Sequence, residues 1–390
     1  MSEYRCIGSF SKQVKRVNDA NNSGADVYSV TKYDGFVRSL DYFKKQVFSR
    51  DLSAYKIVKK GEFAYSTIHL DEGALGLLAD EEALISPMYT TFEIDGSVDR
   101  SYLSYLLKSP NLINQYGLIG QGSVNRRKSV PFKSLAEIEV YIPPLPEQKK
   151  IAEILSGIDN AIASAIKEKQ HRERMRRSAV KQLTRGTSYK GQRKDSGTEF
   201  GMIPAHWECQ LIPICCTIEN SKRQPMNKEE RATMRGTYPY HGATRIQDYI
   251  SKYDYEGEYV LIGEDGDHFS KYNEWEMTQY ATGRFNVSNH AHVIRGTSNC
   301  STQWLYYSLL HRDLTYHLTR QGATRFKLSK ASLECIPALL PPPEEQEQMV
   351  NVFKSITNSI SILGNRVIKL QALKTALSAD LLSGRKRVST

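Results

Sequence analysis

Residues 146–186 read PEQKKIAEILSGIDNAIASAIKEKQHRERMRRSAVKQLTRG and have the pattern of one long helix. Apolar or small residues recur at alternating intervals of four and three, at Ile151, Leu155, Ile158, Ile162 and Ala165, and the phase resumes at Ala179 and Leu183. Such a heptad seam is typical of a helix that packs lengthwise against another long helix. The middle of the seam is polar (Lys169, Arg172, Arg176), so we expect the packing to be strongest at the helix ends. We therefore predict a central helix over residues 147–186, roughly 60 Å long at about 1.5 Å per residue.

A second copy of this pattern covers residues 344–384. One copy slides over the other with a constant offset of 198 residues, which places PPLPEQ (143–148) over PPPEEQ (341–346) and Gly186 over Gly384. Prolines before a helix and a glycine after it are typical start and stop signals. The seam of this copy comprises Ile356, Ile360, Leu363, Val367, Leu370, Leu377 and Leu381. Two long helices with apolar seams need partners, and the simplest arrangement pairs them with each other in antiparallel orientation.

The composition sets limits on the class of protein. A chain of 390 residues is too long for one ordinary core and indicates two or more domains. Hydrophobic residues make up 40% and charged residues 25%, as in soluble globular proteins. No apolar run approaches the ~20 residues of a membrane span, and residues 1–10 lack a signal-peptide core, so we expect a cytoplasmic protein without a membrane partner. The six cysteines form no CxxC pair, which favours reduced, mostly buried thiols.

The net charge of +10 is distributed unevenly along the chain. Residues 147–186 contain ten Lys and Arg against five Asp and Glu, whereas residues 200–343 contain fifteen of each kind. The excess therefore lies mainly on the helices. A nucleic-acid surface on the globular parts must come from local clustering of basic residues, because bulk charge alone does not establish it.

Globular sequence precedes each helix, and the two globular parts follow a similar plan. Short β-type runs at 62–68, 89–94 and 138–142 alternate with turns, and a short helix is predicted at 101–109. The second part repeats this order, with GEYV (257–260) matching GEFA (61–64) and a helix at 302–312. We expect an α+β fold in which two similar globular domains are joined by two long antiparallel coiled-coil helices, with an internal pseudo-twofold repeat. The predicted divisions are a first domain (1–146), the central helix (147–186), a polar linker (187–202), a second domain (203–343), the distal helix (344–384) and a basic tail (385–390).

Several doubled motifs carry a family resemblance. They are the Pro-Pro-x-x-Glu-Gln helix starts, the turns Gln121-Gly122-Ser123 and Gln321-Gly322-Ala323, and the segments LISPMY (84–89) and VSNHAH (287–292). With these motifs the chain resembles the specificity (S) subunit of type I restriction–modification enzymes along essentially its whole length. The resemblance implies two target-recognition domains that each read one half of a split site in double-stranded DNA, and two helices that set the spacing.

The resemblance also implies that this subunit is not catalytic. Adenine methylation would belong to two modification (M) subunits docked on the helices, and cleavage would belong to restriction (R) subunits. The chain would need no cofactor of its own, and S-adenosylmethionine would bind to the M subunit. One departure from the family pattern concerns the lead-in IPAHW (203–207) of the second domain. The first domain begins in what corresponds to the following strand, so it lacks this lead-in and the sequence does not indicate what anchors its edge.

Basic residues are the main candidates for DNA contacts. Guanidinium and ammonium groups neutralise phosphates and can also donate to guanine in the major groove. One cluster follows each Gln-Gly turn, and two polar-aromatic loops with further basic residues lie where the two halves differ, YPYHGATR (238–245) and the segment around Tyr42. Taken singly, each such residue is more often part of a solvated surface. The equivalent placement of the clusters nevertheless favours a protein with two DNA-binding domains. The candidate residues are Arg126, Arg127, Lys128, Lys133, Lys44, Lys45, His241, Arg245, Arg320, Arg325, Lys327 and Lys330.

The residue types raise two other hypotheses, a metal-dependent activity and a purely structural role. His290 and His292, which strand alternation would put on one face, could join Glu264, Asp265 and Asp267 in a metal site. No third ligand has helical spacing and the first half has no matching histidine, so we expect no metal. Motifs for amino-methyl transfer, the Walker lysine and dinucleotide turns are absent from the sequence. The alternative outside DNA recognition is a structural adaptor with two protein-binding heads on a coiled coil, and an autonomous metal-dependent nuclease is a third possibility.

Overall fold

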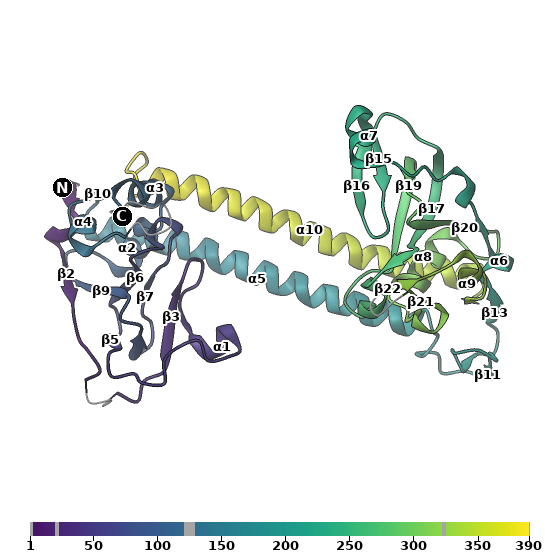
Figure 1. Cartoon of the computed structure of the whole chain (residues 1–390), viewed down its shortest axis with the longest axis horizontal. Helices are drawn as coiled ribbons and strands as arrows, with labels where there is room; N and C mark the ends of the chain where they lie inside the picture. Colours follow the sequence, from purple (N-terminus) through teal and green to yellow (C-terminus); the bar gives the residue numbers. More distant parts are fainter. Residues whose placement is uncertain (1–2, 20–22, 121–128, 322–324, 390) are drawn as a thin grey trace. The chain divides into compact units, whose positions relative to one another are not determined.

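The computed structural model describes residues 3–19, 23–120, 129–321 and 325–389. The chain divides into two compact units, which we call unit 1 (Met1–Ala165 with Arg366–Thr390) and unit 2 (Ile166–Asn365). The long helices α5 (Leu145–Leu183) and α10 (Pro343–Leu381) each contribute residues to both units (Figure 1). This division differs from the predicted domain boundaries, because each long helix packs against a different globular part at each of its ends.

Unit 1 is built from two four-stranded sheets and one separate strand pair. One sheet has the order β2-β9-β6-β7 and the other β4-β3-β8-β5, and β1 pairs antiparallel with β10. The predicted strands at 62–68, 89–94 and 138–142 correspond to β6, β9 and β10, and the predicted helix at 101–109 corresponds to α2. The elements are β1 (Glu3–Cys6), η1 (Ile7–Ser9), β2 (Ser11–Val14), β3 (Val27–Thr31), β4 (Gly35–Arg38), α1 (Ser39–Phe43), β5 (Lys56–Lys59), β6 (Phe63–Ser66), η2 (Leu70–Glu72), β7 (Leu75–Leu77), β8 (Glu82–Ile85), β9 (Tyr89–Ile94), α2 (Arg100–Leu107), α3 (Pro110–Ile119), α4 (Phe132–Ala136) and β10 (Glu139–Ile142).

Unit 2 contains a six-stranded sheet of order β14-β20-β17-β19-β15-β16 and a three-stranded sheet of order β18-β22-β21. The pair β13–β23 repeats the pair β1–β10 of unit 1. The elements are β11 (Arg193–Asp195), β12 (Met202–Pro204), β13 (Glu208–Leu211), α6 (Ile212–Cys215), β14 (Cys216–Ile218), η4 (Asn220–Lys222), α7 (Lys228–Thr233), β15 (Arg235–His241), β16 (Ile246–Ile250), β17 (Tyr255–Gly263), β18 (Asp265–Gly266), η5 (His268–Lys271), β19 (Thr278–Val287), β20 (Ala291–Gly296), α8 (Thr302–Leu310), η6 (Thr315–His317), β21 (Thr319–Gln321), β22 (Arg325–Lys327), α9 (Lys330–Glu334) and β23 (Pro337–Leu340).

The segment predicted to be a polar linker, 187–202, contains a short strand pair. Strand β11 pairs antiparallel with β12, and the turn between them contains Gly197 and Gly201, both with positive φ. Polar residues and glycines are also typical of the turn that joins two antiparallel strands.

The two long helices have equal lengths of 39 residues. Each helix ends shortly before the predicted glycine. Gly186 and Gly384 lie just beyond the last helical turn and have φ angles of +60° and +76°. A left-handed residue at this position is the usual way in which a helix ends.

Packing of the seam residues gives the direction of the helices. In unit 1, Ile151 and Leu155 at the start of α5 are buried in one core with Leu381 and Leu382 at the end of α10. In unit 2, the end of α5 contributes Val180 to a core with Val350 and Phe353 from the start of α10. The helices are therefore antiparallel. Ala165 and Leu363 are also buried, and the remaining seam residues are half-buried, namely Ile158, Ile162, Ala179, Leu183, Ile356, Ile360, Val367, Leu370 and Leu377.

Where the seams turn polar, a hydrogen bond and an ion pair join the two helices. Arg172 donates to the Ser359 hydroxyl over 3.4 Å, and towards the other end Lys374 forms an ion pair with Asp159 at 2.6 Å. Buried seam residues are most frequent at the two ends of each helix, but Ala165 and Leu363 are also buried near the middle, so the prediction is confirmed only in part.

The start of each long helix forms the same hydrogen bonds with its globular part, and we call this set of bonds the joint. Gln148 accepts from the backbone N–H of Asp99, the N-cap of α2, and donates to the Pro143 carbonyl at 2.8 Å. Gln346 accepts from the N–H of Ser301, the N-cap of α8, and donates to the Pro341 carbonyl at 2.8 Å. The internal repeat therefore extends to individual hydrogen bonds.

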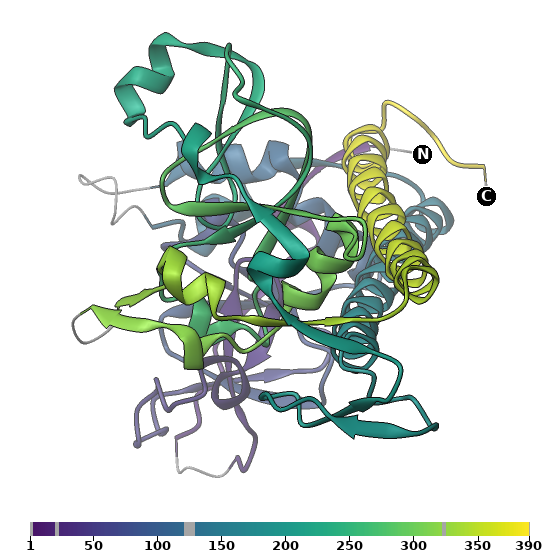
Figure 2. The same cartoon turned by 90° about the vertical axis from the view of Figure 1, so that its right-hand side faces the viewer.

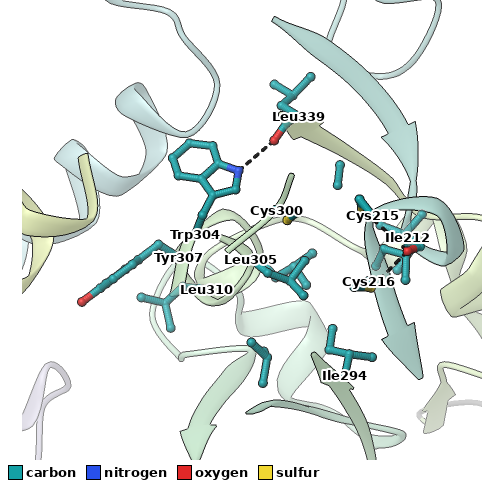
Figure 3. Close-up of a cluster of buried hydrophobic side chains, with 14 of the residues drawn as sticks. Ile212, Cys215, Cys216, Ile294, Cys300, Trp304, Leu305, Tyr307, Leu310 and Leu339 are labelled. Atoms are coloured by element: carbon teal, nitrogen blue, oxygen red, sulfur yellow. Dashed lines mark hydrogen bonds between the residues drawn. The ribbon is translucent and has the colours of Figure 1, made fainter. Parts of the chain in front are cut away.

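A second pair of hydrogen bonds follows the same repeat. The Tyr102 hydroxyl donates to the Tyr141 carbonyl over 2.8 Å. Trp304 Nε1 donates to the Leu339 carbonyl, also over 2.8 Å (Figure 3). Tyr141 and Leu339 are related by the offset of 198 residues. Because both donors are buried, each bond satisfies a polar group inside the core and fixes the short helix against the last strand.

Candidate nucleic-acid interface

In unit 2, the basic residues after the Gln-Gly turn lie on the β21–β22 hairpin and on α9. Figure 2 shows this hairpin (yellow-green) on the side of unit 2 that faces away from α10. Arg320 is exposed and its guanidinium lies 5.7 Å from the centre of the Phe326 ring. Lys330, also exposed, is 3.6 Å from Glu334 on the same short helix. Arg325 begins β22, but its side chain lies outside the described part of the structure.

Lys327 is less available than its position in the sequence indicates. Its ammonium lies 3.6 Å from the Glu264 carboxylate, which also accepts from Arg223 at 2.9 Å. The carboxylate is largely buried and is shared by two cations, so Lys327 also has a structural role in holding the hairpin on β18.

The turn between β15 and β16 places its two candidate residues differently. The Arg245 carbonyl accepts from the N–H of Gly242 at 2.9 Å, and the Arg245 side chain is exposed. His241 was expected on a surface loop, but it is buried, its Nδ1 lies 3.0 Å from Gln279 Oε1, and its ring packs on Phe285. The reason is that His241 is the last residue of β15, paired with Val287, and its side chain points to the core. Burial lowers the pKa of His241, so the ring is kept neutral.

The structure brings the Arg245 turn and the β21–β22 hairpin to neighbouring positions. The Ala243 carbonyl lies against Gly263, where an added Cβ would be only 3.0 Å away. Gly263 ends β17, and two residues later β18 begins and pairs with β22. The segments of Arg245, Arg320 and Lys327 are therefore linked through the end of β17 and through β18, although the sequence separates these residues by up to 82 positions.

In unit 1 the described candidates lie in two separate places. Lys133 is exposed on α4, which packs against η1. Lys44 and Lys45 are exposed directly after α1, which packs against β3 and β4 of the other sheet. Arg126, Arg127 and Lys128 lie outside the described residues.

The histidine and carboxylate groups weighed as metal ligands have other partners. His292 is buried, with Nε2 2.7 Å from the Leu328 carbonyl and Nδ1 accepting from Asn220. His290 is exposed and 3.3 Å from Asp265, so the two histidines do not share a face, because β20 begins only at Ala291. Within the described ranges, no group of three or more histidine, cysteine, aspartate or glutamate residues has an arrangement that could hold a metal ion.

Sequence comparison identifies the family to which this duplicated arrangement belongs. A sequence model described as type I restriction modification DNA specificity domain matches residues 77–171 and 215–372, which is more than half of the chain. The chain belongs to this family. The match covers both copies of the short helix and the start of each long helix, and DNA specificity is the function by which the family is described.

Individual relatives agree with this assignment. A Haemophilus influenzae protein described as a type I restriction enzyme specificity subunit is 36% identical over 150 residues, which span 38% of this chain and 37% of that protein. The MjaVIII specificity subunit of Methanocaldococcus jannaschii is 25% identical over 342 residues, covering 80% of this chain and 76% of that protein. The fold is similar to the solved S subunit of a type I restriction-modification system from M. genitalium, with a TM-score of 0.58 and 14% identity over 98% of this chain and 96% of that one.

Among the helices described, none combines the length and the apolar character that a membrane span requires.

Residue-level reasoning on the sequence missed an anchor at the start of each long helix. The carboxylate of Glu147, which follows the prolines, accepts two hydrogen bonds from Arg387 of the basic tail and one from the N–H of Val388. Its counterpart Glu345 accepts from Trp207 Nε1 and lies 2.7 Å from His206 Nε2, both in the lead-in of the second domain. The tail thus takes the place that the lead-in has in unit 2. In the sequence, the signal that could have indicated this anchor is the Glu-Gln pair that occurs at both helix starts, at 147–148 and 345–346.

Proposed function

We propose that this chain is the DNA-specificity subunit of a type I restriction–modification complex and reads a bipartite site with one recognition domain per half-site. The observation that carries the proposal is the repeated joint of Gln148 and Gln346, which presents two globular frameworks in the same way at the starts of two long helices. The frameworks share the two pairs of hydrogen bonds described above, whereas the segments that differ between them expose the basic residues Lys44, Lys45 and Arg245. A protein that reads two different half-sites needs this combination of shared scaffold and divergent surface.

The chain itself would be non-catalytic and would act as a scaffold without its own cofactor. Methylation and cleavage would be carried out by partner M and R subunits, with S-adenosylmethionine on the M subunit. Exposed apolar side chains on α10 support docking of a partner on the helices, for example Ile368 and Leu373 in unit 1 and Ile362 in unit 2. A protein partner docked along α10 would cover these side chains.

Sequencing of modified bases in cells with and without the gene tests this function. The expected result is methylated adenine in one bipartite motif, present only when the chain and its M subunit are co-expressed. A matched control expresses the M subunit with a chain that lacks residues 203–343, which should lose the complete motif. Absence of any chain-dependent motif in cells that contain the assembled complex would contradict the proposal.

A further inference from the structure

Directly after the β3–β4 hairpin, unit 1 exposes an apolar patch. Leu40, Tyr42, Phe43 and Val47 are between 39% and 56% exposed, although all lie within eight consecutive residues. We call this set the α1 patch. Large apolar side chains are normally scattered singly over a surface, and a contiguous group marks a site of interaction.

The base of the patch is fixed while its tip is exposed. Ser39 is buried and its hydroxyl is 2.9 Å from that of Ser29 on β3. The rings of Tyr42 and Phe43 pack edge to face with centres 4.9 Å apart. Lys44, whose N–H donates to the Leu40 carbonyl, has a φ of 55° and is the only non-glycine residue with positive φ in the described part of the chain. Lys44 is the C-cap of α1, so this left-handed residue ends the short helix and fixes the direction in which the chain leaves it.

The rim of the patch is positively charged. Lys44, Lys45 and Arg50 are exposed, and none of them has an ion-pair partner among the described residues. Two acidic residues lie nearby, Asp41 and Asp51, and hydrogen bonds from Ser53 to the Asp51 carboxylate lower the pKa of Asp51. An apolar centre with a cationic rim complements a ligand that has apolar faces between anionic groups, and a DNA groove has this character, with thymine methyl groups and base edges between two rows of phosphates.

Comparison of the two units shows that the patch is an addition to unit 1. In each unit a hairpin strand, β3 or β15, pairs antiparallel with the next strand and parallel with a later one. In unit 1, residues 39–55 then separate β4 from β5, whereas in unit 2 only residues 251–254 separate β16 from β17. The patch therefore lies where two readers of different sequences should differ.

We propose that the α1 patch is the element with which unit 1 reads the bases of its half-site. Leu40, Tyr42 and Phe43 contact base edges, and Lys44, Lys45 and Arg50 bind the flanking phosphates. The inference rests on the proposed function and adds the residues that determine specificity in one of the two domains.

The experiment maps the methylated motif made by the chain co-expressed with its M subunit. The triple variant Leu40→Ser/Tyr42→Ser/Phe43→Ser should lower discrimination at one or more positions of one half-site by about tenfold or more and leave the other half-site unchanged. Lys44→Ala/Lys45→Ala should weaken binding to all sequences alike and lower the log–log salt slope by about 0.9 for each lost phosphate contact. Tyr33→Ser is the matched control, because Tyr33 is also an exposed aromatic residue but lies at the opposite end of the β3–β4 hairpin, and it should keep the full motif.

Each outcome decides between the inference and its alternatives. The retained half-site of unit 2 reports that unit 2 and its assembly with the M subunit are intact, and the single variant Leu40→Ser repeats the test with a change small enough to keep unit 1 folded. Two intact half-sites in both variants would overturn the inference. Loss of co-purification with the M subunit at unchanged specificity would also overturn it, because the patch would then bind protein. A wild-type complex that methylates no bipartite motif would instead contradict the proposed function.

Discussion

Buried histidines distinguish the two units at the scale of single residues. In unit 2, burial lowers the pKa of His241, His268, His292 and His311, so that the folded state keeps these rings neutral. Unit 1 contains one histidine, His69, which is exposed. The unfolded chain takes up a proton at each of these side chains near pH 6.5, whereas folded unit 2 does so only at lower pH.

Acidification should therefore destabilise unit 2 more than unit 1. Below about pH 6.5 the unfolded state binds more protons than the folded state, so the free energy of unfolding falls with pH by up to about 1.4 kcal/mol per pH unit for each buried histidine. Amide hydrogen exchange at pH 7.0 and 5.5, corrected for the intrinsic rate, should show a loss of protection in β15, β17 and β20 that exceeds any loss in β6 and β9. His69→Gln should not change this difference. Equal loss in both units would contradict the assignment of neutral buried rings.

The direction in which a side chain points cannot be predicted from the residue type alone. The sequence identifies a polar-aromatic loop at 238–245, but the strand extends as far as His241 and turns this ring into the core while Arg245 stays exposed. A shift of one position in the end of a strand reverses the direction of a side chain. For the same reason Lys327 could be recognised as basic, but its pairing with Glu264 depends on the contact between β18 and β22.

At the scale of elements, the helix ends are tied to the globular parts through glycine. An added Cβ on Gly186 would lie 2.7 Å from ring atoms of Pro204 and 3.2 Å from Trp207. Gly197 has a similar φ of +68°, but no atom lies within 4 Å of its added Cβ. Comparison of Gly197 with Gly186 therefore separates the free-energy cost of a left-handed backbone from the cost of a steric clash.

Alanine substitution at these two glycines should give different losses of stability. Gly197→Ala should cost about 1–2 kcal/mol, the usual penalty for a side chain in the left-handed region. Gly186→Ala should cost more, because Pro204 and Trp207 must also move and both are buried in unit 2. Urea unfolding monitored by tryptophan fluorescence measures both values. Similar losses for the two variants would show that the space around Gly186 has no role in joining α5 to unit 2.

The starts of the long helices show what an internal repeat can and cannot predict. The doubled Glu-Gln pair and the constant offset predict that both helices begin alike, and Gln148 and Gln346 do form the same bonds. The partner of the glutamate is not repeated, since Glu147 binds Arg387 of the tail and Glu345 binds Trp207 of the lead-in. Alignment of the two halves cannot find the first of these contacts, because the residues that form it have no common sequence with those that form the second.

For the whole molecule, the repeat predicted two similar α+β domains and two antiparallel helices, and the structure and the family confirm this architecture. The compact units nevertheless differ from the predicted domains. Each unit takes the start of one long helix and the end of the other, because the end of α10 is buried with the start of α5 in unit 1. Sequence patterns locate the boundaries between elements, whereas the boundary between units depends on which elements share a core.

The sharing of α5 and α10 between the units gives the last prediction. If these helices set the distance between the two recognition domains, adding one heptad to each, after Ala165 and after Asn365, should lengthen the unread spacer of the DNA motif. Seven residues preserve the phase of a seam with 3.5 residues per turn and extend each helix by roughly 10 Å. At about 3.4 Å per base pair this corresponds to about three additional base pairs.

The half-site sequences should stay the same in the double insertion variant, because no exposed segment of either globular part is changed. Activity should fall, since about three base pairs also rotate the half-sites by roughly a quarter turn of the 10–10.5 base-pair helical repeat. The measurement is the methylated motif of the double insertion variant. Insertion in only one helix is the control, because it breaks the register between α5 and α10 and should abolish assembly. An active double variant with the original spacer would show that the distance between half-sites is set elsewhere than in the paired helices.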